Sequence, residues 1–223
     1  MRIARESKSV TAYYRPTRPE VLRLVPTTAG RVLDLGCGDG AFGATLKDHT
    51  GGEVWGIDSD PQAAQHANSI IDHVLVGAVH ERIAELPDSH FDAIVCTDTL
   101  ERLVEPGAAL RQLRCKLKPH GVVVAAVPNI RFLPAMGQVL IRKDFPQEDF
   151  GTFDRTHLRY FTRRSTVRMF KTAGYTVQRI QGINAWHGAL GVLLAVLTLG
   201  YFADGLYLQY ACVASPSGPH QAP

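Results

Sequence analysis

The chain has 223 residues, of which 45% are hydrophobic, and its 24 Lys and Arg against 21 Asp and Glu give a formal net charge of +3. This length suits one α/β domain with a sizeable core, expected over residues 1–214, and the scattered basic residues disfavour a nucleic-acid-binding protein. The four cysteines form no Cys-x-x-Cys pair and the nine histidines show no metal-ligand spacing, so we expect reduced thiols, a cytoplasmic location and no bound metal. Residues 1–10 lack the apolar core of a signal peptide, and the polar residues 215–223 are expected to form a flexible tail.

Short apolar runs alternate with helix-like stretches along the chain. Asp60 and Pro61 predict a capped helix start, and Thr162 and Gly174 predict the two ends of a later helix. This alternation is typical of a parallel, doubly wound sheet. Strands are predicted at 32–35, 52–58, 73–76, 91–97, 122–127, 177–183 and 206–213, helices at 41–49, 61–70, 106–116 and 162–174, and a turn at 118–121.

Three alternate glycines, Gly36, Gly38 and Gly40, stand between the first predicted strand and the helix that follows it. Glycine at such a turn lets the backbone approach a ligand without a Cβ in the way. The next strand ends in Asp58, whose carboxylate can accept two hydrogen bonds from the vicinal hydroxyls of a ribose. Together the two motifs predict a nucleoside ligand.

The charges around the glycines bear on which nucleoside this is. Gly36-x-Gly38-x-x-Ala41 formally satisfies the dinucleotide-binding pattern, so an NAD(P)-dependent oxidoreductase is an alternative. Asp34 and Asp39 would repel a pyrophosphate, whereas they would attract a cationic ligand. S-adenosylmethionine (SAM) carries a sulfonium and an ammonium group and no phosphate, so the charges favour SAM.

Four segments carry a family resemblance. Residues 34–40 resemble motif I of the class I SAM-dependent methyltransferases, an acid followed by Gly-x-Gly-x-Gly. The segments FDAIVCTDTLERL and LKPHGVVVAAVPN resemble the family's fourth- and fifth-strand motifs, and DRTHLRYFT at 154–162 is similar to a segment of the bacterial ubiquinone/menaquinone-methylase-like group. The resemblance covers roughly residues 13–215. It implies a Rossmann-like α/β fold, with a seven-stranded, mostly parallel sheet, helices on both faces and an antiparallel last strand. It also implies SAM as the cofactor and O-methylation of a small molecule or of a saccharide- or lipid-linked acceptor.

Two positions depart from the family pattern. Arg102 replaces the usual histidine of Leu-Glu-His-Leu, so any role of that imidazole is absent or moved. Ala78 stands where many members have an aspartate that accepts from the adenine amino group, and its loss is expected to cost about 1–3 kcal/mol of SAM affinity. These departures leave open a third possibility, a catalytically weak methyltransferase-like partner subunit.

The resemblance and the strand ends together give a set of expected SAM-binding residues. The backbone amide of Val79 can read adenine N1, and Tyr14 can close over the methionine end, although Tyr13 and Tyr14 are equally compatible with a helix surface. The set is Asp34, Gly36, Cys37, Gly38, Gly40, Asp58, Ser59, Ala78, Val79, Thr97 and Tyr14.

The segment that contains His157 lies where this family builds its acceptor pocket. His157 is the expected general base, because an imidazole accepts a proton near neutral pH, and Asp154 is expected to orient it. The alternative is that both residues only hold their loop together through local hydrogen bonds. Asn129, Arg159 and Tyr160 are the expected substrate contacts.

Residues 185–203 contain no Asp, Glu, Lys or Arg over nineteen residues, which reaches the length of a membrane span. Three glycines interrupt the segment, and a strand needed to complete the sheet follows it. We therefore predict a helix that forms an apolar wall or lid over the acceptor pocket, with peripheral contact to a membrane or a lipid substrate as the alternative and a span as the least favoured one.

Overall fold

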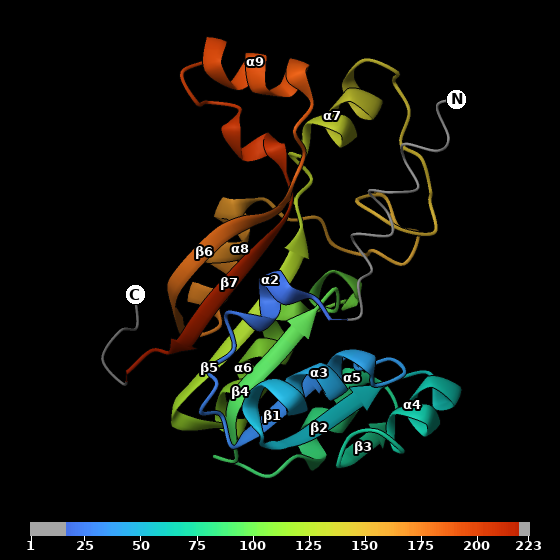
Figure 1. The fold of residues 1–223 in the computed structure, drawn as a ribbon, viewed down its shortest axis with the longest axis vertical. Coiled ribbons are helices and arrows are strands. Elements are labelled where there is room, and N and C mark those ends of the chain that lie inside the picture. Colours follow the sequence, from blue (N-terminus) through green and yellow to red (C-terminus); the bar gives the residue numbers. More distant parts are fainter. Residues whose placement is uncertain (1–16, 219–223) are drawn as a thin grey trace.

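The computed structural model describes residues 17–218, which form a seven-stranded sheet in the order β3-β2-β1-β4-β5-β7-β6 (Figure 1). Strands β1 to β5 pair in parallel, and β7 runs antiparallel to both of its neighbours, β5 and β6. The predicted mostly parallel sheet with an antiparallel last strand is confirmed. The strands are β1 (Arg31–Leu35), β2 (Glu53–Asp58), β3 (His73–Val76), β4 (Phe91–Thr97), β5 (Leu117–Pro128), β6 (Tyr175–Ala185) and β7 (Tyr207–Pro216).

Helices cover both faces of the sheet, as predicted. Side chains alternate along β4: Ile94 and Cys96 belong to a core shared with α6 and α8, whereas Ala93 and Val95 belong to a core shared with α2 and α3. Because successive residues of a strand point to opposite faces, a stretch such as 93–96 is apolar throughout when both faces are covered. The helices are α2 (Pro19–Leu22), α3 (Ala41–Thr50), α4 (Pro61–Ala67), α5 (Val79–Arg82), α6 (Pro106–Lys116), α7 (Leu133–Leu140), α8 (Arg163–Thr172) and α9 (Ala189–Leu197), with 3₁₀ turns η1 (Ile83–Glu85), η2 (Leu100–Arg102) and η3 (Ala203–Leu206).

Two helix starts follow their sequence signals. The Asp60 carboxylate accepts a hydrogen bond from the Gln62 amide at 2.9 Å and so caps α4. Thr162 and Ser165 form a capping box at the start of α8. Helix α4 ends earlier than the predicted residue 70, because the chain turns after it to bring Ile71 into the core.

Several strands are longer than predicted, including β6, which extends two residues beyond the predicted range 177–183 at each end. Strand β5 already begins at Leu117, which pairs with Phe91, and the predicted turn 118–121 loops out of the ladder before Val122 resumes pairing with Ala93. Strand β7 includes residues 215 and 216, which the sequence assigns to a flexible tail, because they pair with the first two residues of β6.

The apolar segment 185–203 is not one long helix. Its first residue ends β6, α9 occupies residues 189–197, and η3 begins at its last residue. No helix in the described range 17–218 is both long and apolar enough to cross a membrane.

Candidate active site

A cavity of about 1030 Å³ opens where the turns after β1, β2, β3 and β4 meet α6. Parallel α/β sheets bind ligands in this position, outside the carboxyl ends of their strands. The structure brings most of the predicted cofactor residues together here: its lining includes Gly36, Cys37, Gly38, Asp58, Ser59, Ala78, Val79 and Thr97. Asp34 and Gly40 lie outside the lining, and Tyr14 lies outside the described residues.

The three glycines of the first turn have positive φ angles but different surroundings. A Cβ on Gly36 would lie 2.6 Å from Thr99 Oγ1, and one on Gly40 would lie 2.9 Å from the Ala67 Cα, so both are required by packing within the protein. A Cβ on Gly38 would meet no atom of the described chain within 4 Å. Gly38 therefore leaves a space that a ligand can fill.

The Asp58 carboxylate is fixed by backbone amides on both of its oxygens. Oδ2 accepts from the Gly38 amide at 2.7 Å, and Oδ1 accepts from the Asp60 amide at 2.9 Å. Each carboxylate oxygen can accept two hydrogen bonds, so each retains one acceptor position. This rigid pair of acceptors, half-buried beside Gly38, suits a vicinal diol.

Asp34 lies beneath the glycine turn and is only 1% exposed. Burial, opposed by Arg18 and reinforced by Asp58, raises the pKa of its carboxyl to about 7. Its Oδ1 has no hydrogen-bond partner among the described residues. A cation bound on the other side of the turn would stabilise the ionised form of this carboxyl.

The turn after β4 carries charged groups whose roles the sequence does not reveal. Asp98 lines the cavity, forms an ion pair with Arg18 and accepts from Gln209 Nε2 at 2.6 Å. Arg102 lines the cavity as well, whereas Glu101 is not part of the lining and is completely buried. Their position just after the end of β4 is the one sequence signal that could have placed these residues in the site. Their ion pairs could not be predicted, because the partners Arg18 and Asp154 are far away in the sequence.

His157 does not reach the cavity lining, and its side chain is 1% exposed. Its Nδ1 lies 3.3 Å from the Thr152 carbonyl oxygen, and its Nε2 lies 3.7 Å from Glu101 Oε1. Burial holds the pKa of the imidazole below its ordinary value. In this structure His157 therefore does not contact a molecule in the cavity, because η2 lies between them.

Asp154 makes no hydrogen bond to the imidazole of His157, contrary to the prediction. Its Oδ2 accepts from Arg102 at 3.2 Å, and its Oδ1 accepts from the amide and the hydroxyl of Thr156 at 2.8 and 2.6 Å. Although burial acts to raise it, the pKa of this carboxyl is lowered overall by the Thr156 hydrogen bonds and by Arg102. Asp154 thus positions Arg102, the residue that replaces the family histidine.

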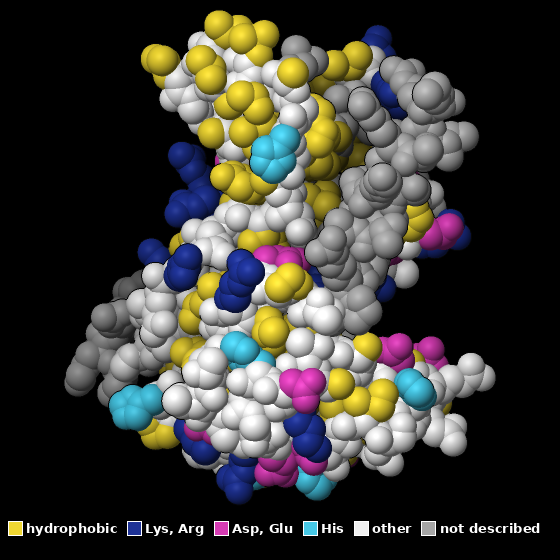
Figure 2. All heavy atoms as spheres, viewed as in Figure 1, with side chains coloured by type: hydrophobic (Ala, Val, Ile, Leu, Met, Phe, Trp, Pro, Cys, Tyr) yellow, Lys and Arg dark blue, Asp and Glu magenta, His cyan; other side chains and the backbone are white. Residues whose placement is uncertain are grey.

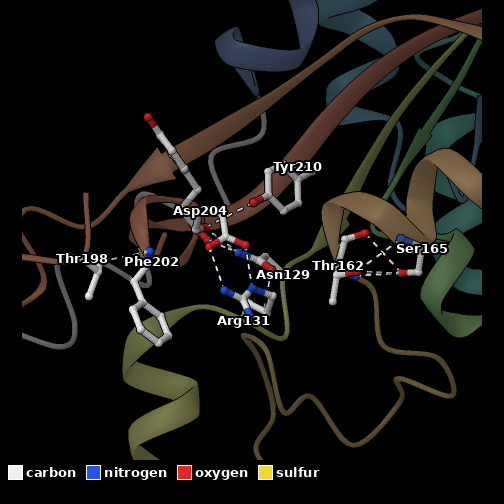
Figure 3. A network of polar contacts seen from close by, with 9 residues as sticks. Asn129, Arg131, Thr162, Ser165, Thr198, Phe202, Asp204 and Tyr210 are labelled. Atoms are coloured by element: carbon white, nitrogen blue, oxygen red, sulfur yellow. Dashed lines mark hydrogen bonds and ion pairs between the residues drawn. The ribbon is translucent and has the colours of Figure 1, made fainter. Parts of the chain in front are cut away.

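Asn129 is a structural clamp rather than an exposed substrate contact. Its side-chain amide donates to the carbonyls of Asp204 and Tyr207, and its Oδ1 accepts from the Arg131 amide (Figure 3). The residue is fully buried, and its amide nitrogen ties the end of β5 to η3 and to the start of β7. The predicted substrate contact is therefore corrected: both the backbone amide and the side chain of Asn129 are bound to the start of β7.

The other two predicted substrate contacts lie at the surface. The Arg159 guanidinium donates to the Val104 carbonyl at 3.0 Å, and Tyr160 stacks edge-on against Phe145. Neither side chain lines the cavity, although Val104 does.

Comparisons with known proteins agree with the site. The family described as "Methyltransferase domain" matches residues 10–180. The chain belongs to this methyltransferase family. A protein of Mycolicibacterium smegmatis named "Probable S-adenosylmethionine-dependent methyltransferase" is 30% identical over 171 residues, which cover 75% of this chain and 60% of the relative.

Two further comparisons concern function and fold. A ubiquinone biosynthesis O-methyltransferase of Aeromonas salmonicida is 26% identical over 164 residues, covering 69% of this chain and 66% of the relative. The chain thus spans about two thirds or less of the length of these two relatives. The crystal structure of a SAM-dependent methyltransferase from Archaeoglobus fulgidus has a TM-score of 0.67 at 20% identity, covering 87% of this chain and 90% of the other, and so shows the same fold.

Family and fold identify a class I SAM-dependent methyltransferase domain, and the cofactor of this domain is SAM. The NAD(P) alternative is not favoured. The residues present in this methyltransferase fit SAM, because Gly38 leaves room for the ligand and Asp58 retains two acceptor positions for its ribose.

Proposed function

We propose that the cavity binds SAM with its ribose on Asp58 and its cationic methionine end over Gly38 and the buried Asp34. Ala78 and the Val79 amide then lie at the adenine end, and Ser59, Cys37 and Thr97 complete the walls. The observation that carries this proposal is the Asp58 carboxylate, held by two backbone amides beside the uncovered face of Gly38. Gly40 and Gly36 support the turn from behind.

We further propose that the reaction is methyl transfer to a hydroxyl oxygen of the acceptor. SAM supplies a methyl group on a sulfonium, so the protein mainly has to align the acceptor and accept a proton. Support comes from the relatives named as O-methyltransferases and from the polar side chains that the turn after β4 contributes to the cavity wall. Arg102, held by Asp154, is our candidate for binding an acceptor oxygen, and His157 supports that wall from behind.

An exposed apolar surface suggests that the acceptor has an apolar part. Six side chains of α9 and the loop after it face solvent, and we call them the α9 patch: Val192, Leu193, Val196, Leu197, Leu199 and Tyr201. Apolar side chains gather at this end of the molecule, where α9 projects beyond the sheet next to α7 (Figures 1 and 2). The cavity lining contains no residue of 185–203, so the predicted lid is not formed over it. We propose instead that the α9 patch contacts a membrane surface or the apolar tail of a lipid-linked acceptor.

Methyl transfer from labelled SAM to phenols with and without a long alkyl tail, presented with lipid vesicles, tests this function. We expect turnover of the tailed phenol at least about tenfold above the tail-free one, because each buried methylene contributes about 0.8 kcal/mol. Leu197→Asp and Leu199→Asp should remove this preference, whereas Val76→Asp, at an exposed apolar position of β3, should retain it. Methylation of amines or thiols but of no hydroxyl would contradict O-methylation, and equal turnover of both phenols would contradict a role of the α9 patch.

The raised pKa of Asp34 predicts that SAM binding depends on pH. Since the cationic ligand favours ionised Asp34, affinity is full above the pKa of about 7 and falls as the pH decreases through it, by up to about tenfold per pH unit. Calorimetric titrations at pH 5.5 and 7.5 should show this loss in the parent, together with proton release on binding. Asp34→Asn should bind with nearly the same affinity at both pH values. A parent protein whose affinity does not change between them would contradict the assignment.

A further inference from the structure

Glu101 combines complete burial with an absence of hydrogen bonds on both carboxyl oxygens. Within residues 17–218, neither Oε1 nor Oε2 has a hydrogen-bond partner, and the residue is 0% exposed. His157 Nε2, which also has no hydrogen-bond partner among these residues, lies 3.7 Å from Oε1. A buried polar group in this state destabilises the fold unless it finds a partner, so the pair requires an explanation.

Two cations of the described range 17–218 act on Glu101, namely Arg102 and Arg18, and each of them already forms an ion pair with another carboxylate. Arg18 is paired with Asp98, and Arg102 is paired with Asp154. An ionised Glu101 would therefore give this buried cluster three carboxylates against two guanidinium groups, with Asp98 acting on Glu101. Several titratable or charged groups interact electrostatically with Glu101 or His157, in addition to the interaction between these two residues. They are Arg18, Cys96, Asp98, Arg102 and Asp154.

The hydrogen bonds of His157 determine which nitrogen carries its proton. Nδ1 faces the carbonyl oxygen of Thr152, which can only accept, so Nδ1 is the donor. In a neutral imidazole Nε2 is then an acceptor, and its complement is a protonated carboxyl group. The directions of both pKa values agree: burial and Asp98 raise the pKa of Glu101, and burial lowers that of His157.

We propose that Glu101 is a neutral carboxylic acid that shares its proton with His157 Nε2, and that this proton fixes residues 152–159 against the turn after β4. The backbone is tied at the same place, because the Glu101 carbonyl accepts from the amides of Leu158 and Arg159 at 2.8 and 2.9 Å. Arg102, next to Glu101, lines the cavity. Glu101 and His157 are therefore positioning residues for this wall of the cavity, and the inference does not depend on which ligand binds there.

The proposal makes the stability of the protein depend on pH in a defined direction. A carboxyl whose pKa is higher in the folded than in the unfolded protein stabilises the fold fully below the unfolded value, near 4.3, and this contribution is lost as pH rises to the folded value. A glutamine at 101 mimics the protonated acid, because its amide can donate to Nε2 without titrating. Relative to the parent, Glu101→Gln should gain up to about tenfold in its folding equilibrium constant per pH unit over this range.

Urea unfolding from pH 4.5 to 8, with hydrogen exchange of the Leu158 and Arg159 amides, tests this dependence. We expect Glu101→Gln to gain stability over the parent as pH rises and to keep both amides protected. The matched control is Glu81→Gln, at an exposed glutamate 4.0 Å from His80, whose stability relative to the parent should not change with pH. The proposal would be overturned if the difference in unfolding free energy between Glu101→Gln and the parent stayed constant with pH. It would also be overturned if the parent became more stable relative to Glu101→Gln as the pH rises.

Histidine NMR of the parent provides a second test, which does not require Glu101→Gln to fold. With nitrogen-15-labelled histidine, the signal missing in His157→Asn identifies residue 157. We expect it to remain a neutral imidazole, protonated at Nδ1, between pH 5 and 8. A doubly protonated imidazole at pH 6 would show that Glu101 is ionised and would overturn the proposal.

Discussion

Gly38→Leu is expected to lower the affinity for SAM about 100-fold, the upper end of the usual effect of overfilling a packed site. The position already has a φ of +53°, and a Cβ there would point into open space of the cavity rather than into the protein. A leucine side chain would therefore fill the space that we assign to the ligand. Calorimetric titration of the folded variant with SAM measures the effect.

A second glycine separates the cavity effect from backbone strain. Gly51 ends α3 with a φ of +65°, is exposed, and would place a Cβ with no described atom within 4 Å. Gly51→Leu should thus destabilise the fold about as much as Gly38→Leu does, by about 1–2 kcal/mol, because both place a leucine in the left-handed region of φ and ψ. It should nevertheless bind SAM like the parent. Equal loss of SAM affinity in both variants would show that strain, and not the occupied cavity, is responsible.

Most of the fold can be predicted because its signals are local. Residues 93–96 are apolar at every position because both faces of β4 are covered there, and Asp60 with Pro61 marks a helix start by its own chemistry. Strand ends are less predictable, because pairing across the ladder decides them: residues 215 and 216 are strand only because β6 offers partners.

The cofactor side of the site was predictable for a similar reason. Gly38 lies in the turn after β1 and Asp58 is the last residue of β2, and the carboxyl ends of parallel strands meet at one edge of the sheet. Which glycine faces the ligand was not predictable, because Gly36 and Gly40 differ from Gly38 only through Thr99 and Ala67, which approach in the folded chain.

The acceptor side depends on contacts that span long sequence separations. Asn129 has the position of a ligand contact, yet β7, some eighty residues later, covers it. His157 lies in a family motif, but its partner Glu101 comes from the turn after β4, and neither residue shows in the sequence that it is buried. The sequence shows that segment 185–203 is apolar. That the side chains of the α9 patch face solvent is evident only in the fold, where this segment forms a short helix, a loop and the first residue of η3.

Asp58→Ala is expected to weaken SAM binding by about 1–3 kcal/mol, roughly 5- to 150-fold, because ribose hydroxyls would lose their acceptors in a partly dry site. Asp58→Asn should lie between the parent and Asp58→Ala, since one of its two side-chain polar atoms still accepts. Titration with SAM at 25 °C measures both variants.

The control for Asp58 stands two residues away. Asp60 also accepts a backbone hydrogen bond in this turn, but it is exposed and does not line the cavity. Asp60→Ala should cost about 1 kcal/mol of stability through the lost helix cap and leave SAM affinity unchanged. If Asp58→Ala bound SAM as tightly as the parent, the ribose would not lie on Asp58. If Asp60→Ala lost as much affinity as Asp58→Ala, the effect would come from loosening of the turn, since both carboxylates hold the same stretch of backbone but only one of them faces the cavity.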